Sequence, residues 1–218
     1  MPVGSAQTET DLANMALTMI GQHVITAISE DSNRAVMCNK RLGDVRDTVL
    51  RSHPWNCASK RASLSDSGVD PAWGFTQSYT LPTDFVRLIA TDSPDEPYQI
   101  EAGNQGGSDA VVLMTDAGSM KIKYIYKLTD VTKMDYSLQQ AISCRLAHEI
   151  CMPLTGDINL SNMMLQKYDA IIKEAQFTDS SAMAAYDKLQ PVDWLTARLT
   201  DATHRPFPTL NSDGSVSG

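Results

Sequence analysis

The segment DSNRAVMCNKRLGDVRDTVLRSHPW, from Asp31 to Trp55, decides the fold. Apolar residues recur in it at spacings of three and four: Ala35, Cys38, Leu42, Val45 and Val49. This spacing predicts one long α-helix with a single apolar stripe. Asp31 or Ser32 can cap its start, and Pro54 closes it because the residue before a proline is pushed out of the helical region. We expect the rest of the chain to pack on this helix.

Two side chains near the end of this helix carry further expectations. Asp47 lies four residues before Arg51, in the acid-first order that favours an ion pair along one helix. Trp55 follows Pro54 directly, so its large apolar ring is positioned to cover the helix end. We therefore expect Trp55 to be buried.

Length and composition limit the class of protein. The chain has 218 residues, of which 42% are hydrophobic, enough to bury a core of its own. Apolar runs are short and the N-terminus lacks the order of a signal peptide, so no transmembrane helix or signal sequence is predicted. The net charge of -8 argues against a protein that wraps nucleic acid. Four cysteines in a chain of this size suggest free thiols in a reducing compartment.

Three further helices are predicted from the same apolar spacing. The first is capped by Thr8 or Thr10, ends at Gly21, and has an apolar face formed by Leu12, Met15, Ala16, Met19 and Ile20. Another begins at Ser137 and is stopped by Pro153 and Gly156. Its inward residues are Leu138, Ala141, Ile142, Leu146 and Ile150, and its outward residues are Gln139, Gln140, Ser143 and Glu149. The last starts near Asn159 or Ser161, and its stripe is Met164, Tyr168, Ile171, Ile172 and Ala175.

The middle of the chain predicts a small antiparallel β region. Residues 110–114 and 120–128 are the clearest strands, and the turn residues 115–119 predict a hairpin between them. In the second strand, apolar and aromatic residues alternate with Lys121, Lys123, Ile125 and Lys127, which predicts one buried face and one solvated face of lysines. Shorter strands are expected within 79–81, 85–90 and 98–101. Residues 56–70, including Lys60 and Arg61, are predicted to be a polar loop, and residues 103–107 a flexible turn.

Together these elements predict an α+β fold, mainly an α-helical bundle of four helices with an inserted antiparallel β subdomain. Residues 1–58 and 130–188 form the discontinuous helical bundle, and residues 59–129 form the loop and the β subdomain. Residues 189–218 contain three prolines and are predicted to be an extended C-terminal arm without a core of its own. Large apolar groups in this arm, Trp194, Leu195 and Phe207, suit contact with a partner.

Candidate residues for chemistry have simpler structural interpretations. Cys144, His148 and Cys151 share one helix face, and His53 and Cys57 form a second pair, so zinc ligands are formally available. The two helical cysteines nevertheless fall beside the apolar stripe, which favours ordinary core packing. A Cys–His nucleophile pair has no further support, and no two carboxylates share a distinctive apolar setting. The lysines 121, 123 and 127 can contact phosphates, but a solvated sheet face is the favoured interpretation. We expect no catalytic, cofactor or metal site.

Four stretches carry a resemblance to a known family. They are Ala16–Leu64, ending in RDTVLRSHPWNCASKRASL; Trp73–Ile89, WGFTQSYTLPTDFVRLI; Tyr124–Asp157, YIYKLTDVTKMDYSLQQAISCRLAHEICMPLTGD; and Trp194–Arg198, WLTAR. Together, and in this order, they resemble the head-to-tail adaptor family of short-tailed bacteriophages, often called tail tubular protein A. The resemblance lapses in Asp92–Asp109 and after Arg198.

The resemblance implies a structural virion protein, made in the host cytoplasm and located at the head–tail interface, with no enzymatic activity. Family members form a homo-oligomeric ring, usually a dodecamer, between the portal protein and the tail nozzle. The ring lines the channel through which DNA leaves the capsid without specific binding, and no membrane is involved. The portal-contacting arm would use Trp194, Leu195, Arg198 and Phe207. Two alternatives remain open: another tail-completion or scaffold component of the virion, and a cell-wall hydrolase, which would need two apposed carboxylates.

Overall fold

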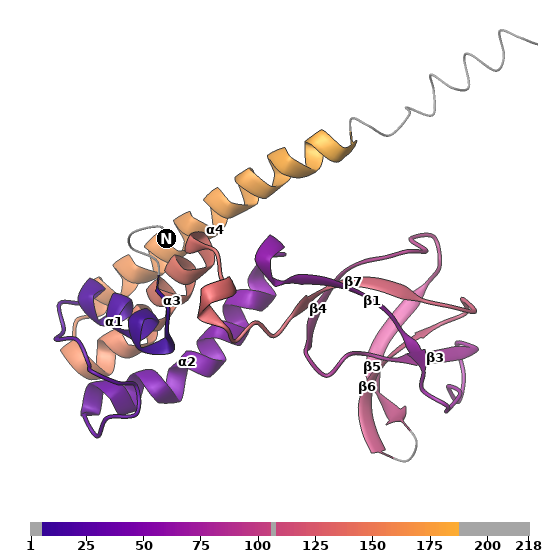
Figure 1. The fold of residues 1–218 in the computed structure, drawn as a ribbon, viewed down its shortest axis with the longest axis horizontal. Helices are drawn as coiled ribbons and strands as arrows, with labels where there is room; N and C mark the ends of the chain where they lie inside the picture. Colours follow the sequence, from indigo (N-terminus) through magenta and orange to yellow (C-terminus); the bar gives the residue numbers. More distant parts are fainter. Residues whose placement is uncertain (1–5, 106–107, 188–218) are drawn as a thin grey trace, which may run out of the picture. The chain divides into compact units, whose positions relative to one another are not determined.

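Helices and two antiparallel sheets confirm the predicted α+β class (Figure 1). The computed structural model describes residues 6–105 and 108–187, with their side chains except at 104, 105, 108 and 179–187. The chain divides into two units, Met1–Gln176 and Phe177–Gly218. Both hydrophobic cores of the described residues belong to the first unit.

The helices lie close to where the sequence predicts them. They are α1 (Glu9–Met19), α2 (Asn33–Ser52), α3 (Tyr136–Thr155) and α4 (Ile158–Asp187). Thr8 caps α1 in a capping box with Asp11, and Ser32 caps α2. The prediction that Pro153 stops α3 is wrong, because it lies within the last turn and Gly156 closes the helix in the left-handed conformation. None of the described helices is both long and apolar enough to cross a membrane.

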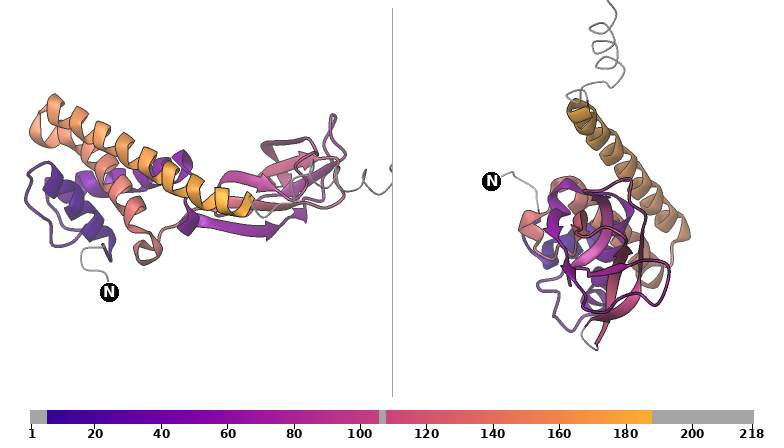
Figure 2. Two further views of the ribbon diagram at one scale, coloured as in Figure 1. Left: turned by 90° about the horizontal axis from the view of Figure 1, so that it is seen from above. Right: turned by 90° about the vertical axis from the view of Figure 1, so that its right-hand side faces the viewer.

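Helices α1, α2 and α3 surround one hydrophobic core and lie together in the views of Figure 2. The whole predicted stripe of α2 is buried in it, as are Trp55 and, from α4, Met164, Tyr168 and Ala175. The prediction that Gln139 and Ser143 face outward is wrong. Both are buried because α3 is covered on two sides, and their side chains bond to the backbone of Ala6 and Leu12 respectively. The α3 helix is therefore central to this core.

The strands form two sheets instead of one. Sheet A has the order β1 (Ser59–Ser63), β7 (Lys121–Tyr126) and β4 (Phe85–Thr91). Sheet B has the order β2 (Ser65–Asp66), β3 (Gln77–Thr80), β6 (Ser108–Thr115) and β5 (Tyr98–Gln105). The predicted hairpin of residues 110–114 with 120–128 is wrong, because β6 pairs with β3 and β5 whereas β7 pairs with β1 and β4. The turn between them carries the chain from one sheet to the other.

Two segments predicted as irregular are strands. Residues 56–70 contain β1 and β2, and β1 is polar because it lies at the edge of sheet A, with β7 on one side only. Residues 103–105 continue β5 and are not a turn. Gly103 suits this strand because a Cβ there would lie 2.5 Å from Cγ2 of Val112. Propensity alone did not indicate either strand, because pairing with neighbours stabilises both.

Sheet A serves both cores. Ile122 and Tyr124 pack with Leu113 and Tyr79 of sheet B in the second core, whereas Ile125 of the same strand is buried in the helical core. Polar contacts reinforce this junction: the Arg87 guanidinium donates to the Arg51 carbonyl oxygen, and Lys127 pairs with Asp47 at 2.6 Å. The predicted Asp47–Arg51 pair is thus replaced by an ion pair between α2 and the end of β7.

Candidate functional site

Cys144, His148 and Cys151 of α3, the formally available zinc ligands, pack against neighbouring side chains and backbone. Cys144 Sγ lies 3.7 Å from Met19 Sδ, and Cys151 Sγ lies 3.3 Å from Thr155 Oγ1. His148 Nδ1 lies 3.0 Å from both the carbonyl and the hydroxyl oxygen of Ser161, so it joins α3 to α4. Among the described residues, no group of three or more His, Cys, Asp or Glu side chains is arranged to hold a metal ion.

The cysteines are unpaired thiols in apolar surroundings. Burial raises the pKa of Cys38 and of Cys57 to about 11, and burial also raises the pKa of Cys144. These thiols are therefore protonated at neutral pH, and a thiol is a poor nucleophile and metal ligand compared with a thiolate. His53, the predicted companion of Cys57, is buried and packs edge-on against Trp55 with ring centroids 4.9 Å apart.

The predicted portal-contacting residues Trp194, Leu195, Arg198 and Phe207 lie outside the described residues.

The predicted lysine face of β7 is divided between two environments. Lys127 turns to α2 and pairs with Asp47. Lys123 and Lys121 lie farther along the strand, and the register of sheet A places Arg61 of β1 directly opposite Lys123. Sequence reasoning missed Arg61 here because it assigned residues 56–70 to a loop. No local signal marks the run Ser59–Ser63 as a strand, because its partner, residues 121–125, lies far along the chain.

A shallow groove of about 440 Å³ on sheet A is lined by three cations, Arg61, Lys121 and Lys123. We call it the basic groove; it is formed by Arg61, Ala62, Ser63, Ala90, Thr91, Asp92, Lys121, Ile122 and Lys123. Its one carboxylate, Asp92, lies 3.8 Å from the Lys121 ammonium and also accepts a hydrogen bond from the Lys121 backbone N–H. Within the described part of the chain, Arg61 and Lys123 form no ion pair. The groove therefore presents positive charge to solvent.

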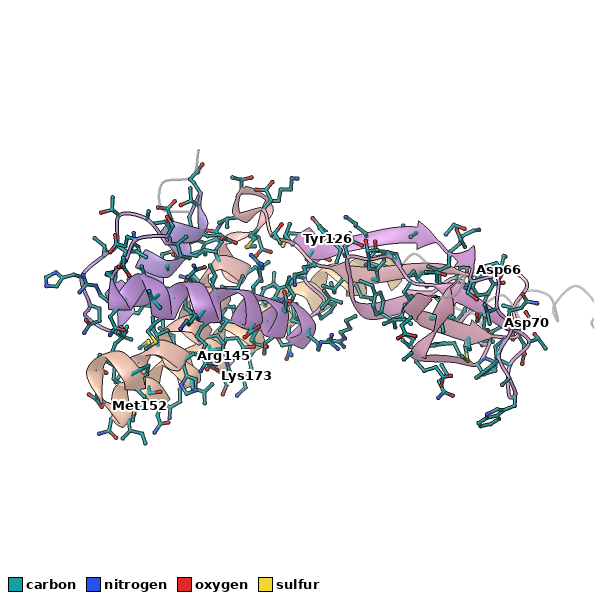
Figure 3. The ribbon with its side chains drawn as sticks, turned by 90° about the horizontal axis from the view of Figure 1, so that it is seen from below. Asp66, Asp70, Tyr126, Arg145, Met152 and Lys173 are labelled. Carbon is teal, nitrogen blue, oxygen red and sulfur yellow. The ribbon has the colours of Figure 1, made fainter. Side chains whose placement is uncertain are left out.

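The opposite face of sheet A holds a closed polar network. Asp84 accepts hydrogen bonds from the Lys60 ammonium at 2.7 Å and from the Tyr124 hydroxyl at 3.0 Å. The Lys60 ammonium also lies 3.7 Å from the ring centroid of Tyr126, which Figure 3 labels where the strands approach the helices. Burial and the bond to Asp84 raise the pKa of Tyr124 to about 12. The charge of Lys60 is thus satisfied internally.

We expect Asp84→Asn to lower the free energy of unfolding by about 1 kcal/mol at neutral pH, because the ion pair with Lys60 is lost and the bond from the Tyr124 hydroxyl no longer has a charged acceptor. Burial acts to raise the pKa of Asp84, but the bonds from Lys60 and Tyr124 outweigh it and the pKa is lowered. The carboxylate therefore stabilises the fold above the ordinary carboxyl pKa and loses that effect as the pH falls. Urea unfolding from neutral to acid pH should show the two proteins converging, and a constant difference would contradict this role.

Large apolar side chains are exposed in several elements. Trp73, in the loop before β3, is 87% exposed, and Phe177 of α4 is 76% exposed. Met152, Ile158 and Met163, near the connection of α3 to α4, are also exposed. Aromatic side chains such as Trp73 and Phe177 are of the type that anchors protein–protein contacts. A comparison of the chain with models of protein families and with curated proteins found no match.

Proposed function

We propose that this chain is a head-to-tail adaptor, a structural virion protein that forms a ring between the portal protein and the tail nozzle of a short-tailed bacteriophage. The main support is that the resembling stretches, which are far apart in sequence, are neighbours in space. Ala16–Leu64 supplies α2 and β1, Trp73–Ile89 supplies β3 of sheet B and most of β4, and Tyr124–Asp157 supplies the end of β7 and α3. The strands β1, β7 and β4 are adjacent in sheet A, and α2 and α3 share the helical core.

The place where the resemblance lapses fits the same interpretation. Asp92–Asp109 supplies β5 and the start of β6, which belong to sheet B and contribute nothing to the helical core. A sequence difference there changes no described side chain of the helical core. Three of the four resembling stretches thus contribute to the helical core and sheet A, and the stretch that differs supplies strands of sheet B.

Exposed aromatic side chains also support an assembly role. A ring subunit needs one surface for each neighbour and further surfaces for the partners above and below. Buried aromatic anchors dominate the binding energy of such contacts. The exposed Trp73 and Phe177 lie in different elements, and each is suited to this role.

In this proposal the four helices act as one bundle that builds a dodecameric ring. The arm, residues 189–218, reaches the portal through Trp194, Leu195, Arg198 and Phe207. The acidic chain leaves DNA free to slide through the channel, since phosphates gain nothing from a negatively charged wall.

The test is light scattering of the protein mixed with its phage's portal ring. Co-migration in a fixed number of copies supports the adaptor, and failure to bind the portal contradicts it.

We expect deletion of Gln190–Gly218 to abolish portal binding and to leave the melting temperature nearly unchanged. Both described cores are built from residues before position 176, so the deletion removes none of their side chains. Thermal unfolding and co-sedimentation with the portal ring measure the two effects separately. Portal binding at full affinity by the truncated chain would contradict the role of the arm.

A further inference from the structure

Charge is segregated between the two sheets. All six Lys and Arg residues of positions 59–129 belong to sheet A or its ends: Lys60, Arg61, Arg87, Lys121, Lys123 and Lys127. Sheet B and its connections, residues 64–82 and 93–120, contain no Lys or Arg but seven carboxylates: Asp66, Asp70, Asp95, Glu96, Glu101, Asp109 and Asp116. The two sheets therefore have opposite charge within one small region.

Half of these cations are already engaged inside the molecule. Lys60 bonds to Asp84, Lys127 pairs with Asp47, and Arg87 donates to the Arg51 carbonyl oxygen. The other half, Arg61, Lys121 and Lys123, are the three that line the basic groove, where Lys121 lies 3.8 Å from Asp92. The cations of positions 59–129 whose side chains form no hydrogen bond or ion pair within the described residues, Arg61 and Lys123, thus lie in this one hollow of the surface.

The acidic sheet carries an exposed aromatic side chain on a supported loop, residues 67–75, which we call the Trp73 loop. Asp66 precedes the loop, Asp70 lies within it, and the indole of Trp73 is 87% exposed. The base of the loop is held in place, because the hydroxyls of Ser67 and Ser78 lie beside one another and within hydrogen-bond distance of the Val69 carbonyl oxygen, and the Val69 N–H donates to the Ser67 hydroxyl. Figure 3 shows Asp66 and Asp70 at the far end of the strands from the helices.

We propose that the basic groove receives the Trp73 loop of a second copy of this chain. The groove offers a guanidinium and two ammonium groups around the small apolar side chain of Ala90, and the loop offers an indole flanked by carboxylates. Cation–π contact and charge pairing then act together at a desolvated site. Because groove and loop are different surfaces, the contact is heterologous and repeats from copy to copy. This inference deepens the proposed ring assembly and rests on it for the presence of neighbouring copies.

A second copy fits the groove better than nucleic acid does. The net charge of -8 repels a polyanion at long range, and Asp92 places a carboxylate inside the groove itself. An acidic loop of a few residues contacts only the groove. Its tryptophan buries apolar surface against the apolar lining of the groove, and a phosphate backbone has no such apolar surface to bury. The hydrogen bonds at the base of the Trp73 loop reduce the number of conformations that docking must order.

The test is sedimentation velocity of the full chain over a concentration series at low salt, without portal protein. We expect reversible self-association that weakens by at least about tenfold in Trp73→Ala and in Lys123→Glu, as for an interface anchor. Asp70→Lys should weaken it likewise. An equimolar mixture of Lys123→Glu and Asp70→Lys should associate again, because the intact groove of one copy meets the intact loop of the other.

Lys40→Glu is the matched control, because it makes the same charge change on an exposed position of α2 and should leave association unchanged. A wild-type chain that stays monomeric at every concentration overturns the proposal, as do variants that associate like wild type. Loss of binding to a short DNA duplex in Lys123→Glu, with self-association unchanged, would assign the groove to phosphates instead. Portal binding is measured separately, so loss of the adaptor function and loss of this interface are distinguishable.

Discussion

Trp55→Ala is expected to lower the free energy of unfolding by about 3–5 kcal/mol, the range for truncation of a fully buried aromatic side chain. The indole is 1% exposed at the end of α2, where it contacts the helical core and the ring of His53. Its Nε1–H donates to the Val49 carbonyl oxygen at 3.0 Å, in the last turn of α2, where the Ser52 hydroxyl is a second donor to the same oxygen. The variant thus opens a cavity and removes one of the two hydrogen bonds to this carbonyl.

Urea unfolding of the full chain measures this effect. Trp55→Phe should recover part of the stability, since it refills most of the cavity but cannot donate the hydrogen bond. Trp73→Ala is the matched control: the same truncation at an exposed tryptophan should change stability by less than about 0.5 kcal/mol. Equal losses of unfolding free energy in Trp55→Ala and Trp73→Ala would contradict burial at the end of α2 as the source of the effect.

Gln139→Leu is expected to destabilise the fold by about 3 kcal/mol although leucine fills a similar volume. The amide of Gln139 is 1% exposed and closes a network: its Oε1 accepts from the Ala6 N–H, and its Nε2 donates to the carbonyl oxygens of Ala6, Val131 and Met134. Removing the amide takes this partner from the N–H and carbonyl of Ala6 and from the Met134 carbonyl, whereas the Val131 carbonyl keeps the bond from the Met134 N–H. Each buried group left unpaired costs about 1–3 kcal/mol. Chemical denaturation measures the loss.

Gln139→Glu should be worse than leucine at neutral pH, because a carboxylate oxygen then faces three carbonyl oxygens in a buried site. Burial raises the pKa of the introduced carboxyl above its value in the unfolded chain, so the folded state binds the extra proton and the variant gains stability as the pH falls. Gln140→Leu is the control, since the neighbouring amide bonds only to the Tyr136 hydroxyl on the exposed side. A pH-independent loss in Gln139→Glu would contradict the buried network.

The helices were predictable because their signals are local. Caps at Thr8 and Ser32, the left-handed glycine at Gly156 and the stripe of α2 are all encoded within a few residues. Gln139 was assigned to the wrong side because polarity predicts exposure, and only the fold places Ala6, more than a hundred residues away, within its reach. A buried amide with all its partners satisfied looks from sequence like a surface residue.

The strands show the opposite limit. Lys121 was correctly assigned to a solvated face, but the assignment of Ile125 to that face was wrong, since the helices cover it. The sheet to which β7 belongs depends on partners from residues 59–63 and 85–91. Turn residues 115–119 indicate that the chain turns, and they carry no information about which strand it joins next. The basic groove could not be predicted for the same reason, because Arg61 meets Lys123 only through this non-local pairing.

Sheet A lies between the two cores, and this has a consequence for how the chain can change over evolutionary time. Residues of sheet B are absent from the helical core among the described side chains, so a strand of sheet B can be lengthened, shortened or exchanged without disturbing the helices. Sheet A has no such freedom, since side chains of β7 pack against Leu113 in the second core and against the helices in the helical core. Insertions and rapid sequence drift should therefore accumulate in β5, β6 and their connection, and related chains should be recognisable by α2, α3 and sheet A long after sheet B has lost any likeness.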